Sequence, residues 1–376
     1  MIRYLGLSIL LSTVLLSSCA PTALKHTKDI TKLRYVSARD TVTPVGVTHF
    51  ILLPEHRVAL STADAVLITG NERLLNSYPI KNVSAFLIRE DTLYIGSSNG
   101  LFSISLRSGE LQKKLLPARD PLPKISALAL DIHKRIWIGT EGFGLFCLDG
   151  GTVRPYSLSP YISSVAVTRD STIWAGSNVG IFRIFEDGEI KRYYEEIPAN
   201  GIAIPDNIVE HMIVDRSDRL WIFMSQAVSV LTPDDYEKYH TQAGDGDVDP
   251  QTFAFLGSPG NHIQKFIQHK TIANTWWAIS SEGLIMISDV EFGAAPQSPG
   301  MPDKIETPKA YLRKISSFKA QENGIAKEFR MQAPSDLAFD DEGNLWISGN
   351  EGIDKIPSEI LNGFELQKKL PATTSR

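Results

Sequence analysis

The chain has 376 residues, 43% of them hydrophobic and 9% aromatic, and its formal net charge at pH 7 is −5. This length is enough for two ordinary domains or for one large repeat domain. No run of lysine or arginine occurs along the sequence, which together with the negative charge excludes the common classes of nucleic-acid-binding protein.

The N-terminal residues predict export to the cell envelope. Arg3 supplies a positive charge, and residues 5–16 form an apolar run that is too short to span a membrane. The run ends at Leu16-Ser17-Ser18-Cys19, which resembles the lipobox of bacterial lipoproteins. The resemblance implies removal of a signal peptide, residues 1–18, and attachment of diacylglycerol and palmitate to Cys19, so that lipid anchors the protein in a membrane. An ordinary secretory signal with an incidental cysteine is the alternative.

The next segment, with the lipidated cysteine at its start, reads as a polar tether over residues 19–32, because it shows no hydrophobic periodicity. No acidic residue directly follows Cys19, so we expect the periplasmic face of the outer membrane, with exposure on the cell surface as second choice. The other cysteine, Cys147, lies in an apolar run, and we expect a buried thiol without a disulfide.

Seven copies of one short pattern occupy the rest of the chain. Each copy has an apolar strand, a polar turn, a strand with a central aromatic residue, a turn through glycine and another apolar strand, often followed by a more polar strand. The clearest copies are residues 131–146, 169–182 and 340–353. The aromatic position is occupied in turn by Ala59, Tyr94, Trp137, Trp174, Trp221, Trp277 and Trp346. Four short antiparallel strands per copy predict an all-β fold, a single seven-bladed β-propeller over residues 33–376.

A single blade cannot bury both of its faces, so the blades must pack around a common axis. We expect the recurring aromatic residue to fill the space between adjacent blades rather than to form a ligand cage. The blades are expected near residues 47–80, 81–117, 124–157, 161–196, 207–240, 262–290 and 334–370.

The ring can close in two ways. Residues 364–371 echo residues 109–117, which suggests that the C-terminus supplies the outer strand of the seventh blade. Alternatively, residues 33–36 take that place and latch the two ends of the chain together. An unlatched ring would leave unpaired sheet edges, so we expect one of the two latches.

The repeated residues resemble the two-component regulator propeller repeat, over roughly residues 45–362. That family forms the periplasmic sensor regions of many hybrid histidine kinases, and the resemblance implies a sensor-type seven-bladed propeller. No kinase or DNA-binding segment accompanies the repeats here, so we expect a stand-alone lipoprotein that binds a partner and does not signal by itself.

Two features are candidates for binding. The connections between blades are longest at residues 234–262 and 289–334, and they emerge on the same face as the turns after the aromatic strand. These turns carry amide or carboxylate side chains at matching places: Asn99, Glu141, Asn178, Gln226, Glu282 and Glu351. Such a ring can hydrogen-bond a glycan, a peptide or an envelope protein, although these residue types are also common in tight turns. The predicted role is a non-catalytic sensor or scaffold without a cofactor.

Two alternatives involve metal or catalysis. The acidic run at residues 245–249 lacks the glycine and the closing glutamate of a calcium loop, so no metal site is expected. The repeats are also similar to those of streptogramin lyases, and that resemblance implies an enzyme with a histidine, glutamate and magnesium centre on the rim. His269 with Glu282 is the pair to test for this role, and the other histidines show no metal-ligand spacing.

Overall fold

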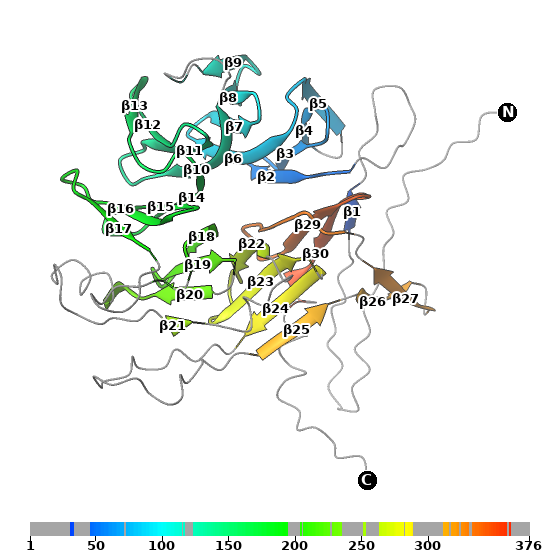
Figure 1. Cartoon of the computed structure of the whole chain (residues 1–376). Coiled ribbons are helices and arrows are strands. Elements are labelled where there is room, and N and C mark those ends of the chain that lie inside the picture. The colour runs from blue at the N-terminus through cyan, green and yellow to red at the C-terminus, as the bar shows by residue number, and fades with distance from the viewer. Residues whose placement is uncertain are drawn as a thin grey trace, which may run out of the picture.

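The computed structural model shows a ring of seven four-stranded antiparallel sheets, which are the blades of a β-propeller (Figure 1). The predicted all-β, seven-bladed fold is confirmed. The structure describes residues 31–33, 46–70, 73–114, 116, 123–194, 204, 206–225, 228–234, 251–252, 263–281, 283–288, 311–315, 317–322, 325–330, 333–358 and 361.

In six blades the four strands follow one another in chain order, from the innermost strand to the outermost, and in the seventh the outermost strand comes from the N-terminus. The first blade is β2 (His49–Leu53), β3 (Arg57–Ser61), β4 (Val66–Gly70) and β5 (Arg73–Tyr78), and the second is β6 (Val83–Arg89), β7 (Thr92–Ser97), β8 (Gly100–Ser105) and β9 (Leu111–Lys114). The third is β10 (Lys124–Leu130), β11 (Ile136–Glu141), β12 (Leu145–Asp149) and β13 (Thr152–Tyr156), and the fourth is β14 (Ile162–Val167), β15 (Ile173–Ser177), β16 (Gly180–Ile184) and β17 (Ile190–Tyr193). The fifth is β18 (Val209–Val214), β19 (Leu220–Met224), β20 (Val228–Leu231) and β21 (Gln251–Thr252), and the sixth is β22 (Ile263–Gln268), β23 (Thr275–Ser280), β24 (Gly283–Ser288) and β25 (Tyr311–Ile315). The seventh is β28 (Asp336–Phe339), β29 (Leu345–Gly349) and β30 (Gly352–Ile356), completed by β1 (Thr31–Leu33).

Position within a blade decides how polar each strand is. In the third blade the five residues from Ile136 to Thr140 on β11 are all buried, because neighbouring blades cover both faces of this central strand. The outer strand β13 is mostly exposed and carries polar residues on alternate positions. The β10–β11 turn passes through Lys134, whose φ is 60°, and the chain reverses there within a few residues.

The aromatic residue of the second strand fills the seam between its own blade and the next. Trp174 packs against Val209 and Met212 of the following blade. Trp137 and Trp221 occupy the same place in two other seams, and each of these three indoles is at most 1% exposed. The expected wedge is therefore confirmed: these side chains are core and not a ligand cage.

The polar turn before each tryptophan strand has a structural role. Asp131 accepts a hydrogen bond from the Trp137 indole at 2.9 Å and another from the backbone N–H of Arg135 at 2.8 Å. Asp215 with Trp221 repeats the arrangement at 3.0 Å. An aspartate six residues before the tryptophan thus satisfies both the turn and the buried indole, which explains the spacing seen in the sequence.

The N-terminal strand closes the ring. β1 pairs antiparallel with β30, with Thr31 opposite Lys355 and Leu33 opposite Ile353. Of the two expected latches, the structure shows the N-terminal one, which begins two residues before the expected residue 33. The C-terminal candidate, residues 364–371, lies outside the described residues.

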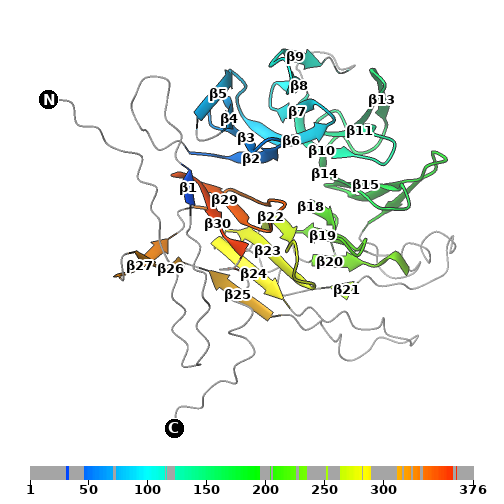
Figure 2. The ribbon, with the colours of Figure 1, turned by 180° about the vertical axis from the view of Figure 1, so that it is seen from behind.

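Two blades end later in the chain than the sequence indicated. The outer strands β21 and β25 lie beyond the expected ends at residues 240 and 290, because long connections precede them. A separate hairpin, β26 (Ser317–Glu322) with β27 (Ile325–Arg330), stands outside the ring in both views (Figure 1, Figure 2). Within the described residues, no helix is long and apolar enough to cross a membrane.

Candidate functional site

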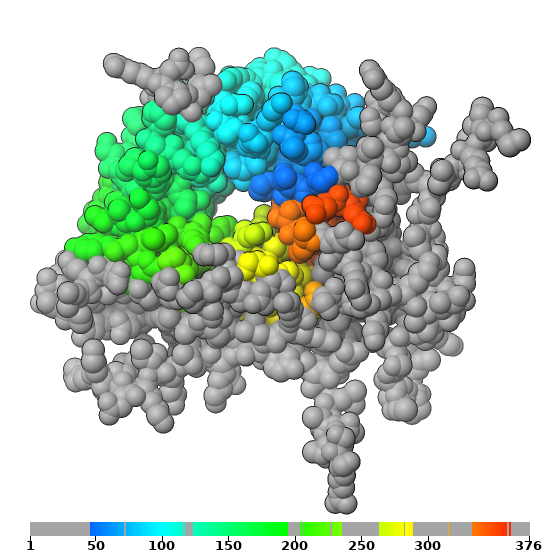
Figure 3. All heavy atoms as spheres, turned by 45° about the vertical axis from the view of Figure 1, so that its right-hand side comes forward, coloured from blue at the N-terminus to red at the C-terminus, as the bar shows by residue number. Residues whose placement is uncertain are grey.

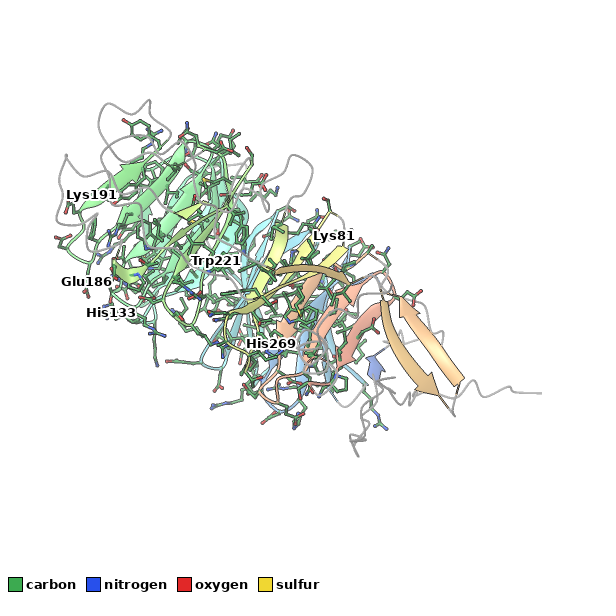
Figure 4. All side chains as sticks on the ribbon, turned by 90° about the horizontal axis from the view of Figure 1, so that it is seen from below. Lys81, His133, Glu186, Lys191, Trp221 and His269 are labelled. Atoms are coloured by element: carbon green, nitrogen blue, oxygen red, sulfur yellow. The ribbon has the colours of Figure 1, made fainter. Side chains whose placement is uncertain are left out.

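The ring has two different faces. One face, called the linker face here, carries the loops that link successive blades and the turns between the second and third strands. Lys81, in a linking loop, forms an ion pair of 3.2 Å with Asp64, in the β3–β4 turn of this face. Seen from the side, Lys81 lies on the opposite side of the ring from His133 and Glu186, which pair at 2.7 Å between two turns of the other face (Figure 4).

Backbone hydrogen bonds join turns of the linker face to linking loops at several places around the ring. The N–H of Gly142 donates to the Pro160 carbonyl at 2.8 Å, and the N–H of Gly180 donates to the Asn207 carbonyl at 2.8 Å. The same type of bond closes the ring, from Val47 to the Gly349 carbonyl at 3.1 Å. At these places the bonds hold the turn in a fixed position relative to the linking loop.

The polar residues predicted for this face lie in its turns wherever the structure describes them. Asn99, Glu141 and Asn178 are exposed, and Glu351 is half-buried. Gln226 and Glu282 lie outside the described residues, as does Cys19. Neighbours already engage some of these side chains: Glu141 pairs with Lys124 at 2.6 Å, and Asn178 accepts the Ser159 hydroxyl at 3.0 Å.

A central opening passes through the ring, bordered by the innermost strand of each blade (Figure 3). Near the linker face, the inner strands of five blades share a shift of pairing register at one residue, which is Ser84, Ser126, Ser163, Glu210 or Gln264. The three serines each donate to a carbonyl of the next blade, as Ser126 does to Ile162. Each of these serines therefore links two inner strands at the mouth of the channel.

The residue after this bulge differs sharply around the ring. In chain order the equivalent positions are His49, Ala85, Ala127, Ser164, His211, Lys265 and Asp336. The second to fourth blades have small, neutral side chains here. Four blades that are consecutive around the ring, from the fifth through the seventh to the first, have titratable side chains: His211, Lys265, Asp336 and His49. We call these four residues the charged arc.

The ion pair at the centre of the charged arc joins the sixth and seventh blades. Lys265 Nζ lies 2.9 Å from Asp336 Oδ1, and the two side chains are 37% and 4% exposed. Asp336 also accepts the backbone N–H of Phe50 at 3.0 Å and that of Leu337 at 2.8 Å. The carboxylate is therefore buried with its hydrogen-bonding capacity largely used, whereas the ammonium group remains partly open.

Both imidazoles of the charged arc are held neutral at pH 7. Burial lowers the pKa of His211 to about 4, the positive charge of Lys265 adds to this effect, and Asp336 opposes it. Burial also lowers the pKa of His49, outweighing the opposite effect of Asp336, and Lys265 contributes to the lowering. The buried Nδ1 of His49 has no hydrogen-bond partner among the described residues.

The histidine singled out for catalysis has a different position. His269 lies in the β22–β23 turn on the face opposite the linker face, is 1% exposed, and accepts the N–H groups of Thr271 and Ile272 through Nδ1. It caps its turn as Asp131 does in the third blade. Ser280 and Gly283, which flank Glu282, lie at the other end of the six-residue strand β23, roughly 17–20 Å away for an extended chain. Within the described part of the chain, no group of three His, Cys, Asp or Glu side chains is placed to hold a metal ion.

Comparisons with known proteins agree on the fold. No family model and no curated protein sequence matches the chain. A streptogramin B lyase structure matches with a TM-score of 0.58 and 13% identity, over 87% of this chain and 96% of the lyase. A catalytically inactive virginiamycin B lyase from Staphylococcus aureus, solved with quinupristin, matches at 0.57 and 17%, over 86% and 98%.

The extracellular domain of a protein assigned as a hybrid two component system from B. thetaiotaomicron matches with a TM-score of 0.59 and 14% identity. The match covers 88% of this chain and 41% of that one, so the propeller corresponds to less than half of the sensor structure. At these identities the similarities show a shared fold. The neighbours include both a lyase and a sensor domain, so the fold is compatible with either role.

Sequence reasoning did not single out the charged arc, although the repeats contain the signal. Once the inner strands of the copies are aligned, with turns of different length allowed before the aromatic residue, His211 and Lys265 fall where Ala85 and Ala127 stand in other blades. A titratable side chain in place of alanine on the inner strand of a propeller marks a position where packing alone does not determine the residue.

Proposed function

We propose that the chain is an envelope lipoprotein, anchored through Cys19, whose propeller binds a ligand or partner protein at the linker face in a sensor or scaffold role without catalysis. The observation that carries the proposal is a set of exposed polar turns on the linker face, close to the charged arc on the inner strands. Asn99, Glu141 and Asn178 are the rim side chains that a partner meets first. The extracellular sensor domain with the same fold supports an extracytoplasmic location. The periplasmic face of the outer membrane is part of the proposal and rests on the residues that follow Cys19.

The alternative is a lyase-like enzyme, favoured by the lyase structures that share the fold. The pair that resemblance suggested is His269 with Glu282. Burial of His269 and its role in capping a turn on the opposite face speak against this pair. A second argument is that the Nε2 of His269 is buried and has no hydrogen-bond partner among the described residues, so it is closed to a substrate.

The partner is tested by crosslinking in intact cells, followed by affinity purification through a C-terminal tag and mass spectrometry. The proposal expects reproducible recovery of one envelope protein, reduced at least about tenfold by the triple variant Asn99→Ala/Glu141→Ala/Asn178→Ala. A triple variant on the opposite face, Asp149→Ala/Glu186→Ala/Asp341→Ala, is the matched control and should leave recovery unchanged. Equal loss in both variants, or no loss in either, contradicts binding at the linker face.

The anchor is tested separately. Cys19→Ser removes the thiolate that lipid attachment requires, so the protein should move from the membrane fraction to the soluble fraction. Cys147→Ser is the control and should remain in the membrane fraction. An unchanged distribution for Cys19→Ser contradicts the lipid anchor.

A further inference from the structure

The charged arc is not required by the architecture of the ring. Its position in the repeat has one structural role, which is to accept a backbone N–H of the next blade. Ser164 performs this role for Met212 at 2.9 Å, and Asp336 performs it for Phe50 at 3.0 Å. A lysine has no acceptor and cannot perform it. The alanines of the second and third blades show that the position also tolerates a methyl group.

An ion pair at this position has a cost in stability. Withdrawing the Asp336 carboxylate from water has a desolvation cost, and replacing buried ion pairs by neutral residues is often neutral or stabilising. Three blades of the same ring pack with Ala85, Ala127 and Ser164 instead. The pair Lys265–Asp336 therefore indicates selection for something other than packing.

The groups that remain available in the charged arc are mostly donors. Asp336 accepts from Lys265, Phe50 and Leu337 and is 4% exposed, so it offers little to a ligand. Lys265 has three ammonium hydrogens, one of which is directed to Asp336, and its side chain is 37% exposed. The neutral imidazole of His211 on the preceding blade carries one N–H, and the unpartnered Nδ1 of His49 is buried, so Lys265 is the donor that a ligand meets first.

We infer that the charged arc binds an anionic group, a carboxylate or a phosphate, which enters the channel and is held by Lys265 with His211 and His49 beside it. A cation is disfavoured because the carboxylate is already neutralised and the ammonium group is the exposed charge. The inference deepens the proposed binding function by naming the chemical class of the ligand. Partial burial at the inner strands strengthens such a charge-assisted hydrogen bond relative to one on an open surface.

The test uses the full-length protein purified in detergent, with binding measured by isothermal titration calorimetry and by thermal unfolding. The probes are inorganic phosphate, acetate, and a peptide with either a free or an amidated C-terminus, and sodium chloride of equal ionic strength controls for screening. We expect saturable binding of at least one anion that exceeds the effect of sodium chloride. Phosphate without acetate would assign a phosphate ligand, and the free peptide without its amide would assign a terminal carboxylate.

The decisive variant is Lys265→Ala/Asp336→Ser, which copies the alanine of the third blade and the serine of the fourth. It retains an acceptor for the Phe50 N–H, so we expect it to fold and to lose anion binding at least tenfold. Lys265→Arg should retain binding. Lys270→Ala, which removes a lysine from the same blade on the opposite face, should change nothing. Equal anion affinity in the wild type and the double variant contradicts the inference, as does an absence of saturable binding to every probe.

Failure of this inference is distinguishable from failure of the proposed function. If the crosslinked partner is recovered with the double variant as with wild type, and no anion binds, the rim function stands and the charged arc is not its site. If anions bind and no protein partner is recovered, the propeller is a small-ligand binder.

Discussion

Asp336, on the inner strand of the last blade, accepts the backbone N–H of Phe50 on the inner strand of the first blade at 3.0 Å. The bond joins residues 286 positions apart in the sequence. At the outer edge of the same blade, β1 pairs with β30 and supplies the fourth strand. The ring is thus closed twice, by a side chain at the channel and by a strand at the rim.

The inner closure predicts that Asp336 and Lys265 contribute unequally to the stability of the fold. Asp336→Ala leaves the N–H groups of Phe50 and Leu337 without acceptors and Lys265 without a counter-ion, so we expect a loss of about 2–4 kcal/mol in the free energy of unfolding. Lys265→Ala/Asp336→Ser keeps an acceptor and removes both charges, so its stability should lie within about 1 kcal/mol of wild type or above it. Urea unfolding of both variants makes the comparison, and equal losses would show that the charges themselves stabilise the ring.

The outer closure predicts that residues 31–33 stabilise the propeller, although they lie far in sequence from β30, the strand of the seventh blade with which they pair. Deleting them exposes the edge of β30 and removes its pairing, for an expected loss of about 1–3 kcal/mol. Deleting residues 22–24, which belong to the expected tether, is the length-matched control and should leave the unfolding temperature unchanged. If both deletions have the same effect, the N-terminal strand is not the latch.

Much of the fold could be predicted because the spacing of residues within each repeat reflects the contacts that stabilise a blade. Asp131 and Trp137 stand six residues apart since one carboxylate serves both the turn and the indole, and the same spacing recurs at Asp215 and Trp221. Alternating apolar strands and glycine turns supply the rest of a blade. Seven copies of such a unit leave few architectures other than a closed ring.

The parts that could not be predicted depend on contacts between distant segments. Both ends of the chain had a strand-like pattern, and only pairing with β30 shows that Thr31–Leu33 completes the seventh blade. The outer strand Tyr311–Ile315 follows a long connection, so local spacing could not assign it to the sixth blade. The charged arc was missed for a related reason: its four residues are spread from position 49 to position 336 and meet only around the axis.

The close packing between blades predicts that Gly176, on β15, cannot be replaced by a larger residue without a loss of stability. A Cβ at Gly176 would lie 2.5 Å from Val209 Cγ1 of the next blade, which is closer than two carbon atoms can approach. Gly176→Ala should therefore lower the free energy of unfolding by about 1–3 kcal/mol. Val209→Ala in the same chain should recover part of that loss by making room. Gly46→Ala has no neighbour within 4 Å of the new Cβ and serves as the control.

Because the His269 side chain is buried, we expect the free energy of unfolding to depend on pH. Burial lowers the pKa of His269 to about 4, and the charge of Arg216 adds to the lowering. The unfolded chain binds a proton at this residue below about pH 6.5, whereas the folded protein binds it only near pH 4, so the unfolded state takes up more protons between these values. The free energy of unfolding should fall by roughly 1–3 kcal/mol from pH 6.5 to pH 4 on account of this residue.

His269→Asp tests this dependence. Aspartate caps the equivalent turns at Asp131, Asp215 and Asp340, so the variant should fold and lose part of the decline between pH 6.5 and pH 4. The pKa values of His211 and His49 are also lowered, so the rest of the decline in stability should remain in this variant. His133→Asn removes an exposed histidine and is the matched control. Identical pH profiles for His269→Asp and wild type would exclude a neutral, buried His269.

Cys147 provides a probe of how the ring opens. Its side chain is 3% exposed and packs with Trp137 in the seam between the third and fourth blades, and burial raises the pKa of its thiol to about 11. The folded protein should therefore resist a thiol-labelling reagent at pH 8, and the thiol should react fully in urea. Deleting residues 31–33 removes the outer strand of the seventh blade, far from the seam that holds Cys147. We expect the ring to unfold as one unit, so labelling of Cys147 in the deletion variant should accelerate in step with the loss of stability. Labelling that stays as slow as in wild type would show that the loss of β1 acts locally.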